Sequence, residues 1–226
     1  MEKKERHSLY PYLILTVAVL TVFLIFKPGK YVSDPLKEAL RAYRDGKYKQ
    51  AFSFFIQADK LNIPEASFSL GAMYFSGKGT SVNIPQALFY YRKAAQRDYA
   101  PAKTTMALLY MEGKNVPKDP EKAVSFAESA AEQNDAEAQI MLAKWFENGQ
   151  NVKKDISKAI RYYEMAAKNG DINAKMALSV IYKEGRDSIP ANVYTAKRWT
   201  DSIQKQRKLE NLFQNRPADY TPNATQ

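Results

Sequence analysis

The sequence predicts an all-α protein, a right-handed α-solenoid of about five helix pairs preceded by one transmembrane helix. An uncharged apolar run lies near the N-terminus, and a pattern of alanine, leucine, aromatic and glycine then returns every 36 residues. Apolar residues make up 45% of the 226 residues, which is enough to bury a core, so disorder is not expected for most of the chain.

The apolar run extends from Leu9 to Phe26, after a short N-terminal tail (1–8). As a helix it would be about 27 Å long, close to the thickness of a hydrocarbon core of roughly 30 Å. A cleaved signal peptide is the alternative, but the run is long for one and no small-x-small cleavage site follows it. We therefore expect an uncleaved anchor. Lysine and arginine before the run favour a cytoplasmic N-terminus, although lysines after it weaken that signal.

A first helix pair is expected over residues 34–60. Asp34 and Pro35 have the residue types of a helix cap and first helical position. Asp45 and Gly46 end this helix, and a second one follows with apolar residues at helical spacing.

Four longer units follow, at about 64–99, 100–135, 136–171 and 172–205. In each, alanine, a large apolar residue and an aromatic recur four residues apart on one helix stripe, and a glycine then ends the helix. Asn or Asp next caps a second helix that carries alanines where two helices must approach closely. One helix–loop–helix unit cannot bury its apolar faces alone, so neighbouring units must stack. The repeat glycines are Gly77, Gly113, Gly149 and Gly185.

A long closing helix is expected from Asn192 to about Phe213, with residues 206–213 as the end of this cap. Terminal units need a more polar outer face, and the run KQRKLEN fits that need. The polar tail 214–226 is predicted to be disordered.

The repeated pattern A-x3-L-[GA]-x2-Y-x2-G, followed by V-x2-D-x3-A-x2-[YF]-x3-A-A, resembles the Sel1-like repeat, a longer-looped relative of the tetratricopeptide repeat. Ala138–Ala167 matches it closely, and the pair at 34–60 looks tetratricopeptide-like. The resemblance implies an adaptor that assembles larger complexes, often in bacterial envelopes. With the anchor, it implies a single-pass protein of the bacterial inner membrane whose repeats lie in the periplasm.

The amino-acid composition contains few of the residue types that catalytic sites use. Cysteine is absent and His7 is the single histidine, which excludes thiol nucleophiles and multi-histidine metal sites. The string SGKGTS at 76–81 fails the phosphate-loop spacing, because Gly79 stands where Ser or Thr is needed. We therefore expect no enzymatic activity, no metal and no cofactor.

Two functions from different classes remain. The first is a membrane-anchored protein–protein interaction scaffold, tethered through Leu9 to Phe26. The alternative is a binder of cell-wall or acidic exopolysaccharide polymer, because the net charge of +10 favours acidic partners. Anionic lipid is a further candidate partner. Nucleic acid is not expected, since the basic residues are dispersed and no nucleic-acid-binding motif accompanies them.

The candidate protein-binding residues lie on the first helix of each unit, on the stripe that should line the concave face. Successive residues turn by about 100°, which places them together and makes the stripe apolar near the membrane and charged toward the far end. The alternative is plain contact between neighbouring first helices. The residues are Phe68, Phe75, Leu108, Met111, Lys144, Glu147 and Lys183.

Overall fold

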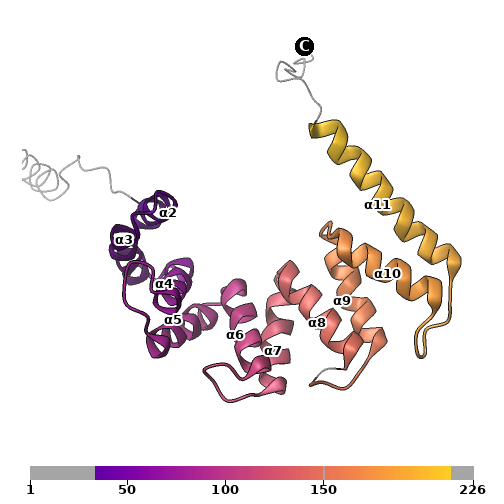
Figure 1. Cartoon of the computed structure of the whole chain (residues 1–226), viewed down its shortest axis with the longest axis horizontal. Helices are drawn as coiled ribbons and strands as arrows, with labels where there is room; N and C mark the ends of the chain where they lie inside the picture. The colour runs from indigo at the N-terminus through magenta and orange to yellow at the C-terminus, as the bar shows by residue number, and fades with distance from the viewer. Residues whose placement is uncertain (1–33, 150, 215–226) are drawn as a thin grey trace, which may run out of the picture.

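The computed structural model describes residues 34–149 and 151–214, which form ten α-helices arranged along a curved arc (Figure 1). Each helix packs chiefly against the helices that precede and follow it in the sequence. This confirms the predicted all-α solenoid of five helix pairs. The helices are α2 (Pro35–Arg44), α3 (Tyr48–Lys60), α4 (Pro64–Ser76), α5 (Ile84–Gln96), α6 (Ala100–Glu112), α7 (Pro120–Glu132), α8 (Ala136–Asn148), α9 (Ile156–Lys168), α10 (Ile172–Glu184) and α11 (Val193–Gln214).

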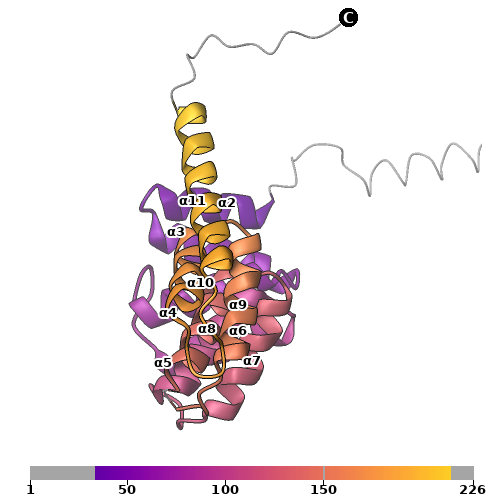
Figure 2. The same cartoon turned by 90° about the vertical axis from the view of Figure 1, so that its right-hand side faces the viewer.

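The last helix, α11, is the longest of the ten described helices, and its C-terminal part extends beyond α10 (Figures 1 and 2). Its first half is held by buried Ala196 and Ile203, whereas Leu209 and Leu212 are exposed. The solenoid core therefore ends near the middle of this helix.

The predicted anchor at 9–26 and residues 215–226 of the predicted tail lie outside the described residues. Among the helices of 34–149 and 151–214, none combines the length and apolar character needed to cross a bilayer.

The second helices of three repeats begin at a side-chain cap. Asn83, Asp119 and Asp155 each accept a hydrogen bond from the backbone N–H three residues later, at 3.1, 3.0 and 2.9 Å. Such caps satisfy amides that have no partner within the helix. The repeat glycines Gly77, Gly113 and Gly149 end the preceding helices with φ of 73°, 71° and 69°. These positive values favour glycine.

Gly185 differs from the other repeat glycines. Its φ is 70° but its ψ is 149°, and the following loop closes through paired backbone hydrogen bonds between Arg186 and Ile189. The extra residue in this loop therefore changes the path from α10 to α11.

Fully buried alanines lie where the helices meet. They have no exposed surface; the first-helix alanine recurs in all four long repeats and the second-helix alanine in the first three, with Ile203 at that position in the last. Beside them, first-helix and second-helix aromatics stack at 5.6, 5.8 and 6.0 Å between ring centroids, with interplanar angles of 13° or less. The buried alanines include Ala66, Ala102, Ala138 and Ala174 on first helices and Ala94, Ala130 and Ala166 on second helices.

A buried polar side chain follows the first-helix alanine in each repeat. Each of these residues hydrogen-bonds to a side chain of the second helix of the same repeat or of the residue just after it, in the last repeat at the middle of the long helix α11. The pairs are Ser67 with Arg97 at 2.9 Å, Lys103 with Ser129 at 2.7 Å, Gln139 with Asn169 at 3.0 Å and Lys175 with Gln206 at 2.5 Å.

The first of these pairs belongs to a larger network around Asp59 of α3. The Asp59 carboxylate accepts hydrogen bonds from Lys93 at 2.6 Å, Arg97 at 3.3 Å and Ser67 at 2.5 Å. Burial raises the pKa of Asp59, but the hydrogen bonds from Lys93 and Ser67 and the two positive charges outweigh it. The pKa of Asp59 therefore lies below its ordinary value of 3.8. The network ties the first helix pair to the first long repeat.

Replacing Ala166 with leucine should destabilise the solenoid, because the alanine is completely buried where α9 meets its neighbours. Overpacking such a site costs about 1–3 kcal/mol, which thermal unfolding would measure. Ala136→Leu, at an exposed position at the start of α8, is the control and should leave the melting temperature nearly unchanged. Equal melting temperatures for Ala166→Leu and wild type would show that the helix contact is assigned wrongly.

Replacing Asp59 with asparagine should lower the free energy of unfolding by about 2–3 kcal/mol at neutral pH, because Lys93 and Arg97 lose their buried partner. The folded-state pKa of Asp59 is depressed, so its stabilising effect is present above pH ~4 and is lost as pH falls through that pKa. The difference between wild type and Asp59→Asn in urea unfolding should therefore shrink below pH ~4. Asp45→Asn, in an exposed pair with Lys47, should change stability by less than about 1 kcal/mol.

Candidate functional site

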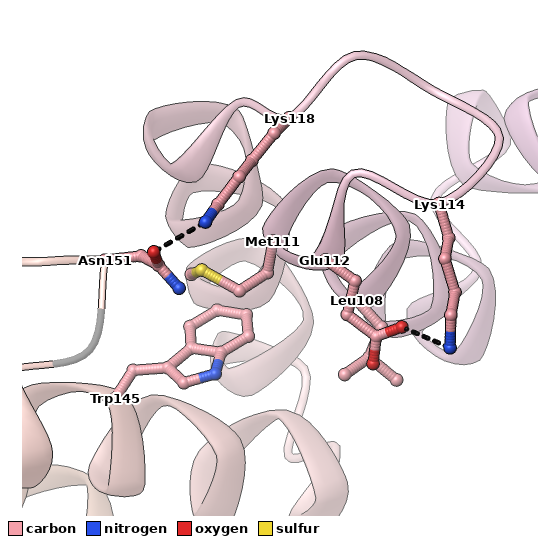
Figure 3. Close-up of a pocket in the computed structure, with 7 residues that line it drawn as sticks. All are labelled: Leu108, Met111, Glu112, Lys114, Lys118, Trp145 and Asn151. Atoms are coloured by element: carbon pink, nitrogen blue, oxygen red, sulfur yellow. Dashed lines mark hydrogen bonds and ion pairs between the residues drawn. The ribbon is translucent and has the colours of Figure 1, made fainter.

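A pocket of about 480 Å³ opens between the C-terminal end of α6, the loop that follows it, and α8 of the next repeat (Figure 3). Its walls combine apolar side chains from the two helices with polar side chains from the two loops. The lining residues are Leu108, Met111, Glu112, Lys114, Lys118, Trp145 and Asn151.

The apolar side of the pocket is built around Met111 and Trp145, whose side chains lie next to each other in Figure 3. Met111 is buried, whereas Trp145 and Leu108 are partly exposed. Trp145 occupies the repeat position held by Leu109 and Ile181, both of which are buried. The larger indole is left partly uncovered, which gives the pocket an aromatic surface.

The polar side of the pocket joins the loops of two successive repeats. The Lys118 ammonium donates a hydrogen bond to the Asn151 side-chain oxygen at 2.6 Å, and Lys114 pairs with Glu112 at 3.1 Å. Asn151 has a φ of 64°, a left-handed backbone conformation that asparagine tolerates, at the point where the loop turns. Lys118 faces a neutral partner, so its charge is not compensated within this contact.

At the next junction, between α8 and α10, the two loops also meet through a lysine, but the described residues form no apolar surface there like that of Met111 and Trp145. Lys154 pairs there with Asp187 at 2.9 Å. Glu147, at the repeat position of Met111, accepts a hydrogen bond from the Tyr163 hydroxyl at 2.7 Å and pairs with Arg186. Burial, together with this hydrogen bond and the Glu147 charge, raises the pKa of Tyr163. The junction between α8 and α10 therefore has an ionic cluster around Glu147, at the position where the junction between α6 and α8 has the apolar Met111.

The seven residues predicted as one binding stripe fall into different surroundings. Leu108 and Met111 come together in the pocket. Phe68 packs against the rings of Tyr91 of α5 and Tyr99 at the start of α6, with centroids 5.6 and 5.5 Å away.

The charged end of the stripe is also divided. Glu147 is engaged by Tyr163 and Arg186, whereas Lys144, Lys183 and Phe75 are exposed. Among the described residues, the stripe therefore does not form one continuous apolar-to-charged surface.

Sequence reasoning missed the residues that complete the pocket: Trp145, Glu112, Lys114, Lys118 and Asn151. The sequence does contain a pattern that marks the turning point of each loop. Positive φ recurs at every thirty-sixth residue, and the residue there is always glycine, asparagine or aspartate, the types that tolerate this conformation. These residues are Gly79, Asn115, Asn151 and Asp187.

The arrangement is suited to binding rather than to bond making. It offers an aromatic and aliphatic surface, two ammonium groups, one carboxylate and one amide, and it contains neither a nucleophile–base pair nor a metal-ligand set within its lining.

Comparison with known proteins identifies the repeat family. The Sel1 repeat family model matches residues 64–99, 101–135, 136–171 and 172–201, more than half of the chain. No curated protein sequence matches the chain significantly.

Two solved structures share the fold. A Sel1 repeat protein from Oxalobacter formigenes is 30% identical, with 88% of this chain and 84% of that one covered and a TM-score of 0.68. A protective antigen of uropathogenic Escherichia coli is 28% identical over 69% of this chain, with a TM-score of 0.62. The aligned part spans about a third (33%) of that antigen. Sel1 repeat folds generally serve as protein–protein interaction scaffolds and are generally not enzymatic. The chain belongs to the Sel1 repeat family.

Proposed function

We propose that the protein is a membrane-anchored scaffold that captures a protein partner in the pocket between α6 and α8 and so assembles a complex in a bacterial envelope. The observation that carries this proposal is the partly exposed indole of Trp145 beside Met111 and Leu108, framed by Lys114 and Lys118.

The pocket has the features of a protein-binding hot spot. Binding energy at interfaces concentrates in a few aromatic and large apolar residues within pockets, surrounded by a polar rim that excludes water. The volume of about 480 Å³ lies within the range of ligand pockets and has room for one or two inserted side chains. The solenoid holds the pocket on two rigid helices, so little conformational entropy is lost on binding.

The membrane tether rests on the uncharged run from Leu9 to Phe26. A tethered scaffold would hold its partner within reach of the membrane and raise the effective concentration of other bound components. The similar protein from O. formigenes and the E. coli protective antigen both come from bacteria, which supports the bacterial part of this proposal.

A second candidate function is binding of an acidic wall or exopolysaccharide polymer. The net charge of +10 favours it, and Lys153 is exposed in the loop after α8, beside Lys154, which pairs with Asp187. A partner held mainly by such surface charge would dissociate at high salt, whereas one held by the apolar pocket would resist salt.

Leu108→Asp should remove partner capture, because it places a carboxylate on the apolar side of the pocket. Crosslinking in native membranes followed by mass spectrometry would measure the loss, which we expect to exceed tenfold for the partner. Leu40→Asp is the matched control, since Leu40 is also partly exposed on a first helix but lies at the other end of the solenoid. A crosslinking pattern identical to wild type, with the protein folded, would contradict the proposed site.

The uncleaved anchor predicts that protein purified from membranes begins at Met1 and requires detergent. A reporter fused after Gln226 should be active only outside the cytoplasm. A mature N-terminus near Tyr31, found by mass spectrometry, would show that the run is a cleaved signal peptide. A reporter active only in the cytoplasm would reverse the orientation.

A further inference from the structure

We infer that the partner presents an extended acidic segment with two apolar side chains, one in the pocket between α6 and α8 and the other in a second pocket directly across Asn151. This inference rests on the proposed function, because it specifies the chemistry of the segment that the scaffold captures.

The second pocket lies between α7, α9 and the loop after α8, and its volume is about 440 Å³. Its apolar lining includes Val124, Phe146 and Val152. The Phe146 ring is held in place by stacking on Tyr162, with centroids 6.0 Å apart. Like the first pocket, it is formed by side chains from two successive repeats.

The two pockets share one wall. Asn151 lines both, and the consecutive residues Trp145 and Phe146 of α8 line one pocket each. A bound chain that fills both pockets must therefore pass over the contact between Lys118 and Asn151. An extended segment can do so, because residues two or four apart point to the same side and advance about 3.3 Å per residue.

The charges beside the pockets favour an acidic segment. Lys114 and Lys118 line the first pocket and Lys153 and Lys158 the second, whereas Glu112 and Glu121 are the carboxylates in the two linings. Glu112 is paired with Lys114, and within the described part of the chain Lys118 has only the neutral Asn151 as its hydrogen-bond partner. Acidic residues between the two apolar side chains would therefore meet Lys118 at the crossing point.

Lys158 also marks the edge of the second pocket. Its ammonium lies over the Phe146 ring, 4.8 Å from the centroid. This cation–π contact keeps the positive charge beside the apolar surface, where it can meet a carboxylate next to an inserted side chain. A sugar polymer would use the positive charges but would leave the apolar linings of both pockets unfilled.

The test uses the full-length chain in a non-ionic detergent with Trp199→Phe, which leaves Trp145 as the sole tryptophan of the two in the sequence. The probes are twelve-residue peptides of glutamate and serine with two leucines two or four positions apart. We expect one of these spacings to shift Trp145 fluorescence and to bind. Replacing either leucine with alanine should weaken binding about tenfold, and replacing glutamate with lysine should abolish it.

Two variants connect the binding to the two pockets. Val152→Asn, which removes apolar surface without adding charge, should weaken the two-leucine peptide about tenfold but leave the peptide that lacks the second leucine unaffected. Lys118→Gln should weaken the acidic peptide and reduce its salt dependence. Lys197→Gln, on the exposed surface of α11 and outside both linings, is the matched charge control and should bind as wild type does.

Three results would overturn the inference: no binding of either acidic peptide, equal binding with one leucine or two, or an equal Trp145 response to polygalacturonate or to phosphatidylglycerol vesicles. Failure of the proposed function is distinguishable from these. If Leu108→Asp abolishes crosslinking to the native partner while no acidic peptide binds, the scaffold proposal stands and this inference fails. If Leu108→Asp leaves crosslinking unchanged, the scaffold proposal fails whatever the peptides do.

Discussion

The close approach of helices at fully buried alanines is the constraint on which the rest of the structure depends. Ala138 and Ala166 have no exposed surface; the position of Ala138 is alanine in all four long repeats, and that of Ala166 is alanine in the first three. A methyl group lets two helices come near enough for the larger apolar residues on either side to interlock, and any longer side chain would separate them. Because this contact recurs every 36 residues in the first three long repeats, successive helix pairs stack in the same way and the chain forms an arc (Figure 1).

The candidate site arises where a repeat departs from this regular packing. Trp145 stands where neighbouring repeats have leucine and isoleucine, and the indole is too large to be covered completely. Met111 occupies the repeat position that Glu147 holds in the next repeat. The Glu147 carboxylate accepts a hydrogen bond from the Tyr163 hydroxyl and forms an ion pair with Arg186. The repeats thus share one backbone arrangement but differ in residue type at two equivalent positions. As a result, the junction between α6 and α8 has an apolar pocket, and the junction between α8 and α10 has an ionic cluster.

The helices, their caps and their glycine ends could be predicted from the sequence because each depends on residues close together in the chain. Asn83 and Gly77, for example, act within one turn of their own helices. The pocket could not be predicted in the same way, since Lys118 and Asn151 meet only after two loops have been placed by separate repeats. The concave stripe shows the same limit. Helical periodicity put Phe68 on that stripe, but Tyr91 and Tyr99 of other elements pack against it.

The distribution of charge bears on which partner chemistry the surface can select. The net charge of +10 includes lysines that are already engaged in holding repeats together, such as Lys93 with Asp59 and Lys154 with Asp187. Their charge is offset locally, so it adds little to the attraction of a distant polymer. Lys118 has a neutral partner and adjoins an apolar pocket. Any carboxylate can pair with the exposed Lys118, but only one that carries an attached apolar group also fills the space next to Trp145. Charge and shape are then read together, which is the basis on which a protein segment is distinguished from a polymer that carries charge alone.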